Sequence, residues 1–147
     1  MPFRQNKSLK HVPLPIAGHT LMAFTHKALP TLEFSAPDGL RSDLRIAFEV
    51  VLSRPDGSRD VVTGTRPGMT SDFQSAYEVL SLLIGQVAIS AFAHSNGQLE
   101  ITFDDGTVLE VQPDNYEAWH FQQPAPYSRV KSDRGYFSLT GYGGGLI

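Results

Sequence analysis

The chain has 147 residues, of which 41% are hydrophobic, and it contains 13 Gly, 10 Pro and no Cys. This length suits one domain with one hydrophobic core, and the lack of cysteine excludes disulfide scaffolds, zinc ribbons and thiol catalysis. Twelve Lys and Arg against fifteen Asp and Glu give a formal net charge of −3, which argues against a general nucleic-acid-binding protein.

The first part of the chain predicts strands. Residues 1–12 are polar and basic, without the apolar stretch of a secretory signal, and predict a flexible N-terminal segment. Residues 20–25 and 31–35 are strand candidates. Residues 44–52 alternate between apolar and other side chains, which predicts one half-buried strand, followed after a turn by another strand over 59–65.

Residues 71–84 predict the principal helix. Ser71 and Gln74 have the spacing of a capping box at its start, and Gly85 supplies the stop. Its apolar stripe at helical spacing consists of Phe73, Tyr77, Leu80 and Ile84. The charge-free stretch 79–99 also contains Gly, Gln, His and Asn, whereas a membrane-spanning helix needs about 20 mostly apolar residues. We therefore expect a buried helix followed by a buried strand, in a cytoplasmic protein without a membrane segment.

The sequence predicts four three-residue turns that end in glycine, at Pro37–Gly39, Pro55–Gly57, Ser95–Gly97 and Asp104–Gly106. Such a turn places its glycine in the left-handed conformation and closes a hairpin with a bulge. At the last turn, a three-residue loop sets Ile101 opposite Leu109 and Leu99 opposite Val111, so the apolar side chains share one face. A two-residue loop would set Ile101 against Glu110 and expose that face.

The turn before it extends this hairpin into a three-stranded antiparallel meander over residues 87–94, 98–103 and 107–111. The apolar pairs expected across its first two strands are Ala93 with Leu99, Ala91 with Ile101 and Ile89 with Phe103. Because each pair follows from the loop length, the prediction fixes the register of all three strands.

The C-terminal part is less regular. Residues 116–121 and 135–141 are strand candidates, residues 122–127 predict a proline-broken loop, and the Gly-rich tail 143–147 is either flexible or threaded along the body. Taken together, the elements predict a single domain over residues 1–147. Its fold class is α+β, with an antiparallel, hairpin-rich sheet and the principal helix packed on it.

Few residues have the spacing of a catalytic or metal site. There is no H-E-x-x-H motif and no helical pair at metal-ligand spacing among His11, His19, His26, His94 and His120. A metal site at His19 and His26, near the ends of a strand candidate, is the alternative to surface or capping roles. No G-x-S-x-G motif occurs, Ser128–Lys131 matches S-x-x-K only in its letters, and the glycines at 143–145 lack the Lys of a phosphate loop. We therefore expect no catalytic residue, no metal and no cofactor.

Acidic and aromatic residues gather towards the end of the chain. They are Asp104, Asp105, Asp114, Tyr116, Glu117 and Trp119, with Glu110 and His120 beside them. Carboxylates near a histidine could serve as general acid and base. Alternatively, the aspartates satisfy turn chemistry and form a solvated edge, and an acidic edge beside aromatics also suits a basic protein partner. Trp119 is then either a core or an interface residue.

Residues 97–111, GQLEITFDDGTVLEV, and the later Tyr116-Glu117-Ala118-Trp119 resemble a family of small uncharacterised bacterial proteins. The shared pattern is G-x-L-x-[IL]-x-F-x-D-G-T-x-L-x-V and then Y-E-A-W, with a Gly-rich tail like that at 143–145. The resemblance covers residues 80–121 and this tail. Members of this kind are often encoded beside polymorphic toxins, so the resemblance implies an immunity protein and carries over no catalytic residue.

We therefore expect a non-enzymatic immunity protein that binds a cognate toxin domain through the acidic and aromatic cluster. Complementary charge would favour a basic toxin, such as a nuclease, with no direct binding of nucleic acid by this chain. Two alternatives remain open. One is a small hydrolase-like enzyme that uses the region from Asp114 to His120, and the other is a structural or oligomerisation module without a toxin partner.

Overall fold

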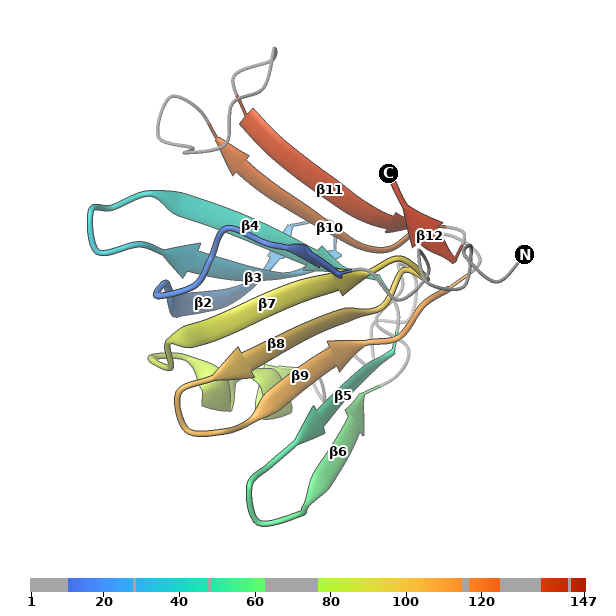
Figure 1. Ribbon diagram of the computed structural model, residues 1–147. Coiled ribbons are helices and arrows are strands. Elements are labelled where there is room, and N and C mark those ends of the chain that lie inside the picture. The colour runs from blue at the N-terminus through green and yellow to red at the C-terminus, as the bar shows by residue number, and fades with distance from the viewer. Residues whose placement is uncertain are drawn as a thin grey trace.

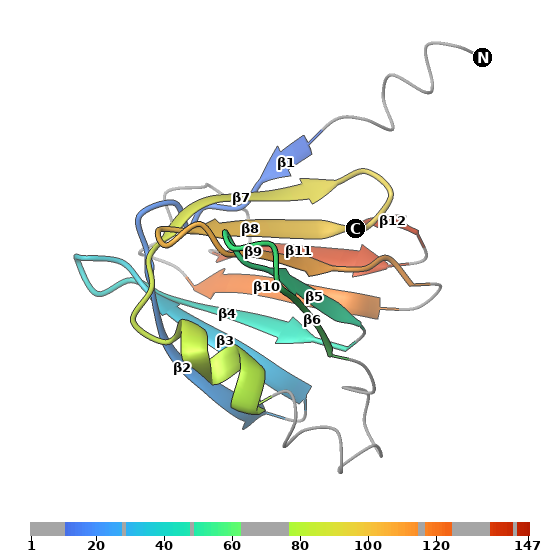
Figure 2. The same cartoon turned by 90° about the horizontal axis from the view of Figure 1, so that it is seen from below.

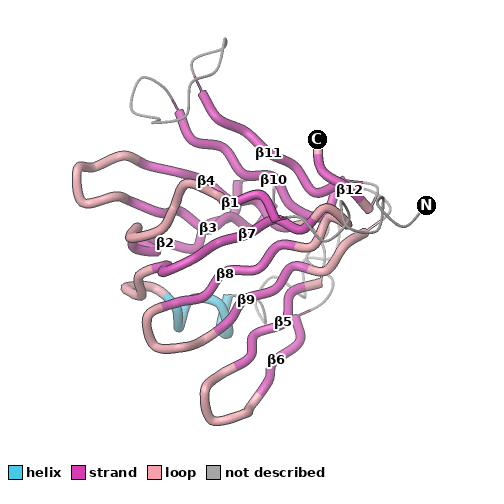
Figure 3. Tube along the Cα trace, in the orientation of Figure 1, coloured by secondary structure: helices cyan, strands magenta, loops and turns pink. Residues whose placement is uncertain are grey.

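The computed structural model describes residues 11–27, 29–47, 49–62, 77–114, 117–124, 136–142 and 144–147. These residues form two six-stranded antiparallel sheets and one short helix (Figures 1 and 3). The predicted α+β class with antiparallel, hairpin-rich pairing is confirmed. No helix in the described part of the chain is both long and apolar enough to cross a membrane.

The first sheet holds the predicted meander at its centre. Its strands in spatial order are β1 (His11–Pro13), β7 (Ala88–His94), β8 (Leu99–Phe103), β9 (Val108–Val111), β5 (Val50–Ser53) and β6 (Arg59–Val62). The strand predicted over 59–65 is therefore β6, and residues 63–65 lie outside the described residues. Residues 11 and 12 of the predicted flexible segment pair with β7 as part of β1, whereas residues 1–10 lie outside the described residues.

The second sheet contains the N-terminal hairpins and the C-terminal strands. In spatial order it consists of β12 (Gly145–Leu146), β11 (Tyr136–Tyr142), β10 (Glu117–Pro124), β4 (Arg41–Ile46), β3 (Leu29–Ser35) and β2 (Thr20–Lys27). The Gly-rich tail thus contributes an edge strand along β11. Ile147 also exchanges two backbone hydrogen bonds with Thr140, of 2.8 and 2.9 Å.

The hydrophobic core lies between the two sheets, which form two layers in Figure 2. Phe34 of β3 stacks on Phe103 of β8 with ring centroids 6.5 Å apart, so the layers are in direct contact. At one corner Leu21 exchanges backbone hydrogen bonds with Gly85 and Gln86, which tie the start of β2 to the segment before β7. The sheets therefore share one continuous core.

The prediction of one strand over residues 44–52 is wrong, because this stretch contributes to β4 in one sheet and to β5 in the other. The alternation continues across the crossing because both sheets turn their inner faces to the same core. Leu44 and Ile46 of β4 and Val50 and Leu52 of β5 are all buried. Alternation of apolar side chains along the sequence indicates which of them face the core, but it does not indicate to which sheet a strand belongs.

All four predicted turns are confirmed. Their glycines have φ between 90° and 97°, and in each turn the Asp or Asn before the glycine accepts a hydrogen bond from the backbone N–H two residues on. The predicted pairing of Ile101 with Leu109 and of Leu99 with Val111 is also observed. These local bonds fix the loop length and, through it, the register.

One predicted pair across β7 and β8 is wrong. Ala88, and not Ile89, lies opposite Phe103, because a bulge occurs between Ala88 and Ser90. The extra residue turns Ile89 outwards, where 55% of its surface is exposed.

Only the end of the predicted helix lies within the described residues. Residues 77–80 form an α-helical turn that tightens into the 3-10 turn η1 (Ser81–Leu83) and ends at Gly85, whose φ is 96°. Leu80 and Leu83 are buried where this turn lies beside β2 (Figure 2). The Tyr77 ring is partly exposed but stacks on the buried Phe24 of β2, with ring centroids 6.0 Å apart. Ile84 is exposed, so the predicted stripe is wrong at this position. The tighter turn shifts the buried face away from the ideal helical period. Phe73 and the proposed cap lie outside the described residues.

The prediction of a loop over residues 122–127 is wrong at its first three residues. Strand β10 continues through Gln122, Gln123 and Pro124, and residues 125–127 lie outside the described residues. Gln123 is fully buried, and its amide N–H groups donate to the carbonyl oxygen of Pro15 and to Ser42 Oγ, both at 3.0 Å. These tertiary hydrogen bonds hold the strand where the local sequence favours a break.

Candidate functional site

Trp119 is a core residue. Its side chain has no exposed surface, and its indole Nε1 donates a 2.8 Å hydrogen bond to the carbonyl oxygen of Gly97. Gly141 lies opposite it on β11 and leaves room for the ring, because a Cβ there would stand 2.7 Å from Trp119 Cε2 and from the Gly97 oxygen. The hypothesis that Trp119 itself contacts a partner is therefore wrong for this fold.

Asp104 and Asp105 form the exposed tip of the β8–β9 hairpin. Asp104 Oδ1 accepts from the backbone N–H of Val87 at 3.2 Å, and Asp105 Oδ1 accepts from that of Thr107 at 2.8 Å. Asp105 thus serves the turn, as turn chemistry predicts, whereas Asp104 ties the tip to the segment before β7. Both residues are exposed. Their charge is available to a partner while their geometry is fixed by the hairpin.

Asp114 and Glu117 lie at the opposite end of the first sheet from this tip. Strand β9 leads away from the β8–β9 turn towards the start of β10 (Figure 1). At about 3.3 Å per residue, residues 107–113 span roughly 20 Å. The acidic residues that cluster in the sequence therefore lie in two separate places. Tyr116 lies outside the described residues.

His120 lies on the outer face of the second sheet. Its Nδ1 and Thr140 Oγ1 are 2.7 Å apart and hydrogen-bonded across β10 and β11. Burial, and then the positive charge of Arg45, lower the pKa of His120, while the charge of Glu117 opposes the shift. The imidazole is therefore predominantly neutral near pH 7, in the state that a general base requires.

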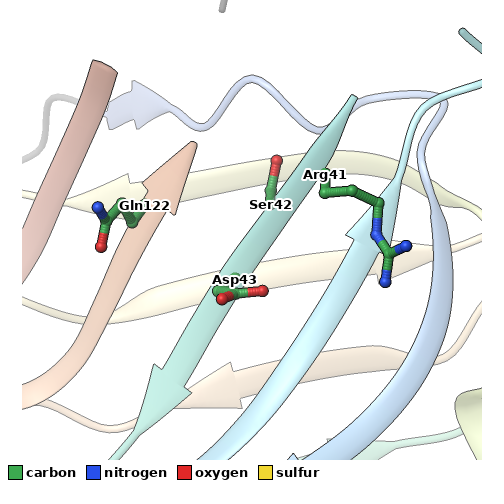
Figure 4. Close-up of a pocket in the computed structure, with 4 residues that line it drawn as sticks. All are labelled: Arg41, Ser42, Asp43 and Gln122. Atoms are coloured by element: carbon green, nitrogen blue, oxygen red, sulfur yellow. The ribbon is translucent and has the colours of Figure 1, made fainter. Parts of the chain in front are cut away.

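A cavity of about 220 Å³ opens on the same face, where β4 pairs with β10. It is lined by Arg41, Ser42, Asp43 and Gln122 (Figure 4). Figure 4 shows the Arg41 guanidinium directed away from Asp43 and Gln122, and Arg41 Nη2 lies 3.2 Å from Glu33 Oε1. The charged groups of this cavity do not converge on one point.

A second cavity, of about 340 Å³, lies between the loop before β2 and the β3–β4 turn. Its lining consists of Ala17, Gly18, His19, Ala36, Pro37 and Asp38. Only 9% of the His19 surface is exposed, and His19 Nδ1 is buried without a hydrogen-bond partner. Burial lowers the pKa of His19, and the charge of Asp38 partly offsets this. Within the described residues, no group of three or more His, Asp or Glu side chains is placed to hold a metal ion.

Sequence reasoning missed one feature on the outer face of the first sheet. Glu100 and Glu110 lie directly opposite each other on β8 and β9. The signal was present, because pairing Ile101 with Leu109 also places these two glutamates side by side.

Comparison with known proteins places this chain in a family. Residues 12–138 match a family of unknown function, DUF6188, and this span runs from β1 into β11. The chain belongs to that family. Neither the curated proteins nor the solved structures gave a match.

Proposed function

We propose that this protein is an immunity protein, which binds and neutralises a toxin domain without catalysing a reaction. The proposal follows from the resemblance in residues 97–111 and 116–119, and the charge of the first of these segments supports it. Residues 97–111 contain Glu100, Asp104, Asp105 and Glu110 and no Lys, Arg or His. This segment alone carries −4, whereas the whole chain carries −3, so the remainder sums to +1.

A charge concentrated on one hairpin favours a basic partner. Oriented charge accelerates the encounter of two proteins, and a toxin that acts at low copy number must be captured quickly. The hairpin is held by two neighbouring strands and by turn hydrogen bonds, so binding would order little of it. The proposed partner is a basic toxin domain, such as a nuclease, whose active site or substrate approach is blocked on binding.

The test uses the protein encoded by the adjacent open reading frame as the toxin. The wild type should bind it and protect cells that express it. Asp104→Lys/Asp114→Lys should slow association at low salt and reduce its salt dependence, with a smaller effect on dissociation. An association rate equal to that of the wild type at low salt would mean that these acids form only a solvated rim.

Asp38→Lys/Glu78→Lys is the matched control. It changes the net charge equally, and Asp38, like Asp104, accepts a backbone N–H, from Leu40 in place of Val87. Association should remain close to that of the wild type in this control. Equal melting temperatures of the two double variants would exclude loss of folding as the cause of slower binding.

The enzyme hypothesis is favoured by one specific observation, the hydrogen bond of His120 to Thr140 under the influence of Glu117. Steady substrate turnover that is lost in His120→Asn and in Glu117→Gln would support it over the immunity function. A chain that neither binds the neighbouring toxin nor turns over a substrate would leave the structural or oligomerisation module.

A further inference from the structure

The outer face of the first sheet carries an unusual pair of like charges. Leu99, Ile101 and Leu109 point into the core, so Glu100 and Glu110 point outwards from neighbouring positions of β8 and β9. Directly opposed residues on antiparallel strands have Cβ atoms about 5 Å apart, and two like charges in this position are destabilising.

In the part of the chain that the structure describes, no lysine or arginine forms an ion pair with either glutamate. Gln98 Nε2 donates to Glu110 Oε2 at 3.1 Å, but an amide is neutral. His94 Nε2 lies 3.3 Å from Glu100 Oε1, and this contact is an ion pair only when the imidazole is protonated. Five of the six strands of this sheet contain no Lys or Arg, and Arg59 lies on the edge strand β6, two strands or about 10 Å from β9.

Apolar side chains flank the acid pair along the same cross-strand row. Phe92 of β7 lies opposite Glu100, and Pro13 of β1 lies opposite Phe92. On the other side, Val51 lies opposite Glu110 but is only 4% exposed, and Val61, opposite Val51 on β6, is 56% exposed. Aromatic and apolar side chains are typical of the centre of a protein-binding site, and a charge placed among them is favourable when the partner supplies the opposite charge.

We propose that this face is the docking surface for the toxin, with an Arg or Lys side chain of the toxin seated between Glu100 and Glu110. This inference rests on the immunity function proposed above and assigns the contact that anchors the complex. An arginine fits best because its planar fork can donate to both carboxylates. Binding would relieve the repulsion of the free protein, and the apolar flanks would exclude water from the ion pairs. The tip aspartates Asp104 and Asp105 would then steer the encounter.

The first measurement concerns the free protein. Glu110→Gln removes one of the two like charges and keeps a side chain that can bond with Gln98. It should raise the melting temperature at low salt by roughly 1–4 °C, and the gain should shrink at high salt. Glu78→Gln, which makes the same charge change on the exposed helical turn, should give no such gain.

The second measurement is the dissociation rate from the product of the adjacent open reading frame. Glu100→Gln/Glu110→Gln should dissociate about 10-fold faster or more, because it loses the anchoring ion pairs. Phe92→Ala should also dissociate faster, whereas Glu78→Gln should match the wild type.

Each other outcome overturns the inference in a distinguishable way. Equal melting temperatures of Glu110→Gln and Glu78→Gln would show that no repulsion is stored on this face. A dissociation rate unchanged in Glu100→Gln/Glu110→Gln would place the interface elsewhere while the immunity function stands. A wild-type protein that neither binds the toxin nor protects cells would refute the immunity function, and the docking surface with it.

Discussion

Replacing Gly141 by alanine tests whether the Trp119 contact joins the two sheets as described. The new Cβ would stand 2.7 Å from the Gly97 carbonyl oxygen and from Trp119 Cε2, both too close for a carbon atom. The indole must move, which strains or breaks its 2.8 Å hydrogen bond to Gly97 in a fully buried site. Overpacking costs about 1–3 kcal/mol, and a disrupted buried hydrogen bond costs about 1–3 kcal/mol. We therefore expect Gly141→Ala to lose about 2–6 kcal/mol of unfolding free energy.

Urea and thermal denaturation measure this loss, with Gly145→Ala as the control. A Cβ at Gly145 would meet its nearest atoms at 3.8 Å, and neither glycine needs a positive φ, so the control should lie within about 0.5 kcal/mol of the wild type. In a Trp119→Phe background, which lacks Nε1, Gly141→Ala should cost less than in the wild type, because the contact with the Gly97 carbonyl oxygen remains while the indole hydrogen bond is already absent. A small loss from Gly141→Ala in the wild type, or an equal loss in both backgrounds, would refute the reasoning.

Three further predictions concern the turns, pH and metal content. Gly106→Val and Gly57→Val should each lower the unfolding free energy by about 1–2 kcal/mol or more, because both glycines have a positive φ. Gly106→Val should cost more, since a Cβ at Gly106 would stand 2.8 Å from Pro55 Cγ, whereas a Cβ at Gly57 would meet no atom within 4 Å. Melting temperatures equal to that of the wild type would contradict the turn geometry. Burial lowers the pKa of His19 in the folded state, so on acidification the unfolded chain binds the proton first. The unfolding free energy should therefore fall as the pH drops below about 6.5. In His19→Gln, the urea midpoint should fall less between pH 7.5 and 5.5 than it does in the wild type. The purified protein should hold no stoichiometric metal after dialysis against a chelator, as elemental analysis would check.

The turns, and the strand pairing that depends on them, could be predicted from the amino-acid sequence alone. At Asp104–Gly106 the left-handed glycine, the side-chain bond of Asp105 and the apolar stripes on both flanks all agree on one loop length. These interactions join residues only a few positions apart, so no other part of the chain is needed to specify them. The stop at Gly85 is local in the same sense.

The assignment of strands to sheets and the burial of single side chains depend on tertiary contacts. The alternation over 44–52 marked the side chains that face the core, but only packing assigned β4 and β5 to different sheets. Trp119 became a core residue because Gly97 and Gly141, each 22 residues away, supply its acceptor and its space. The acidic residues that cluster in the sequence lie far apart in the fold, because strand β9 runs along the sheet between Asp105 and Asp114. Proximity along the chain determines turns, whereas burial and the composition of a surface depend on contacts between distant segments.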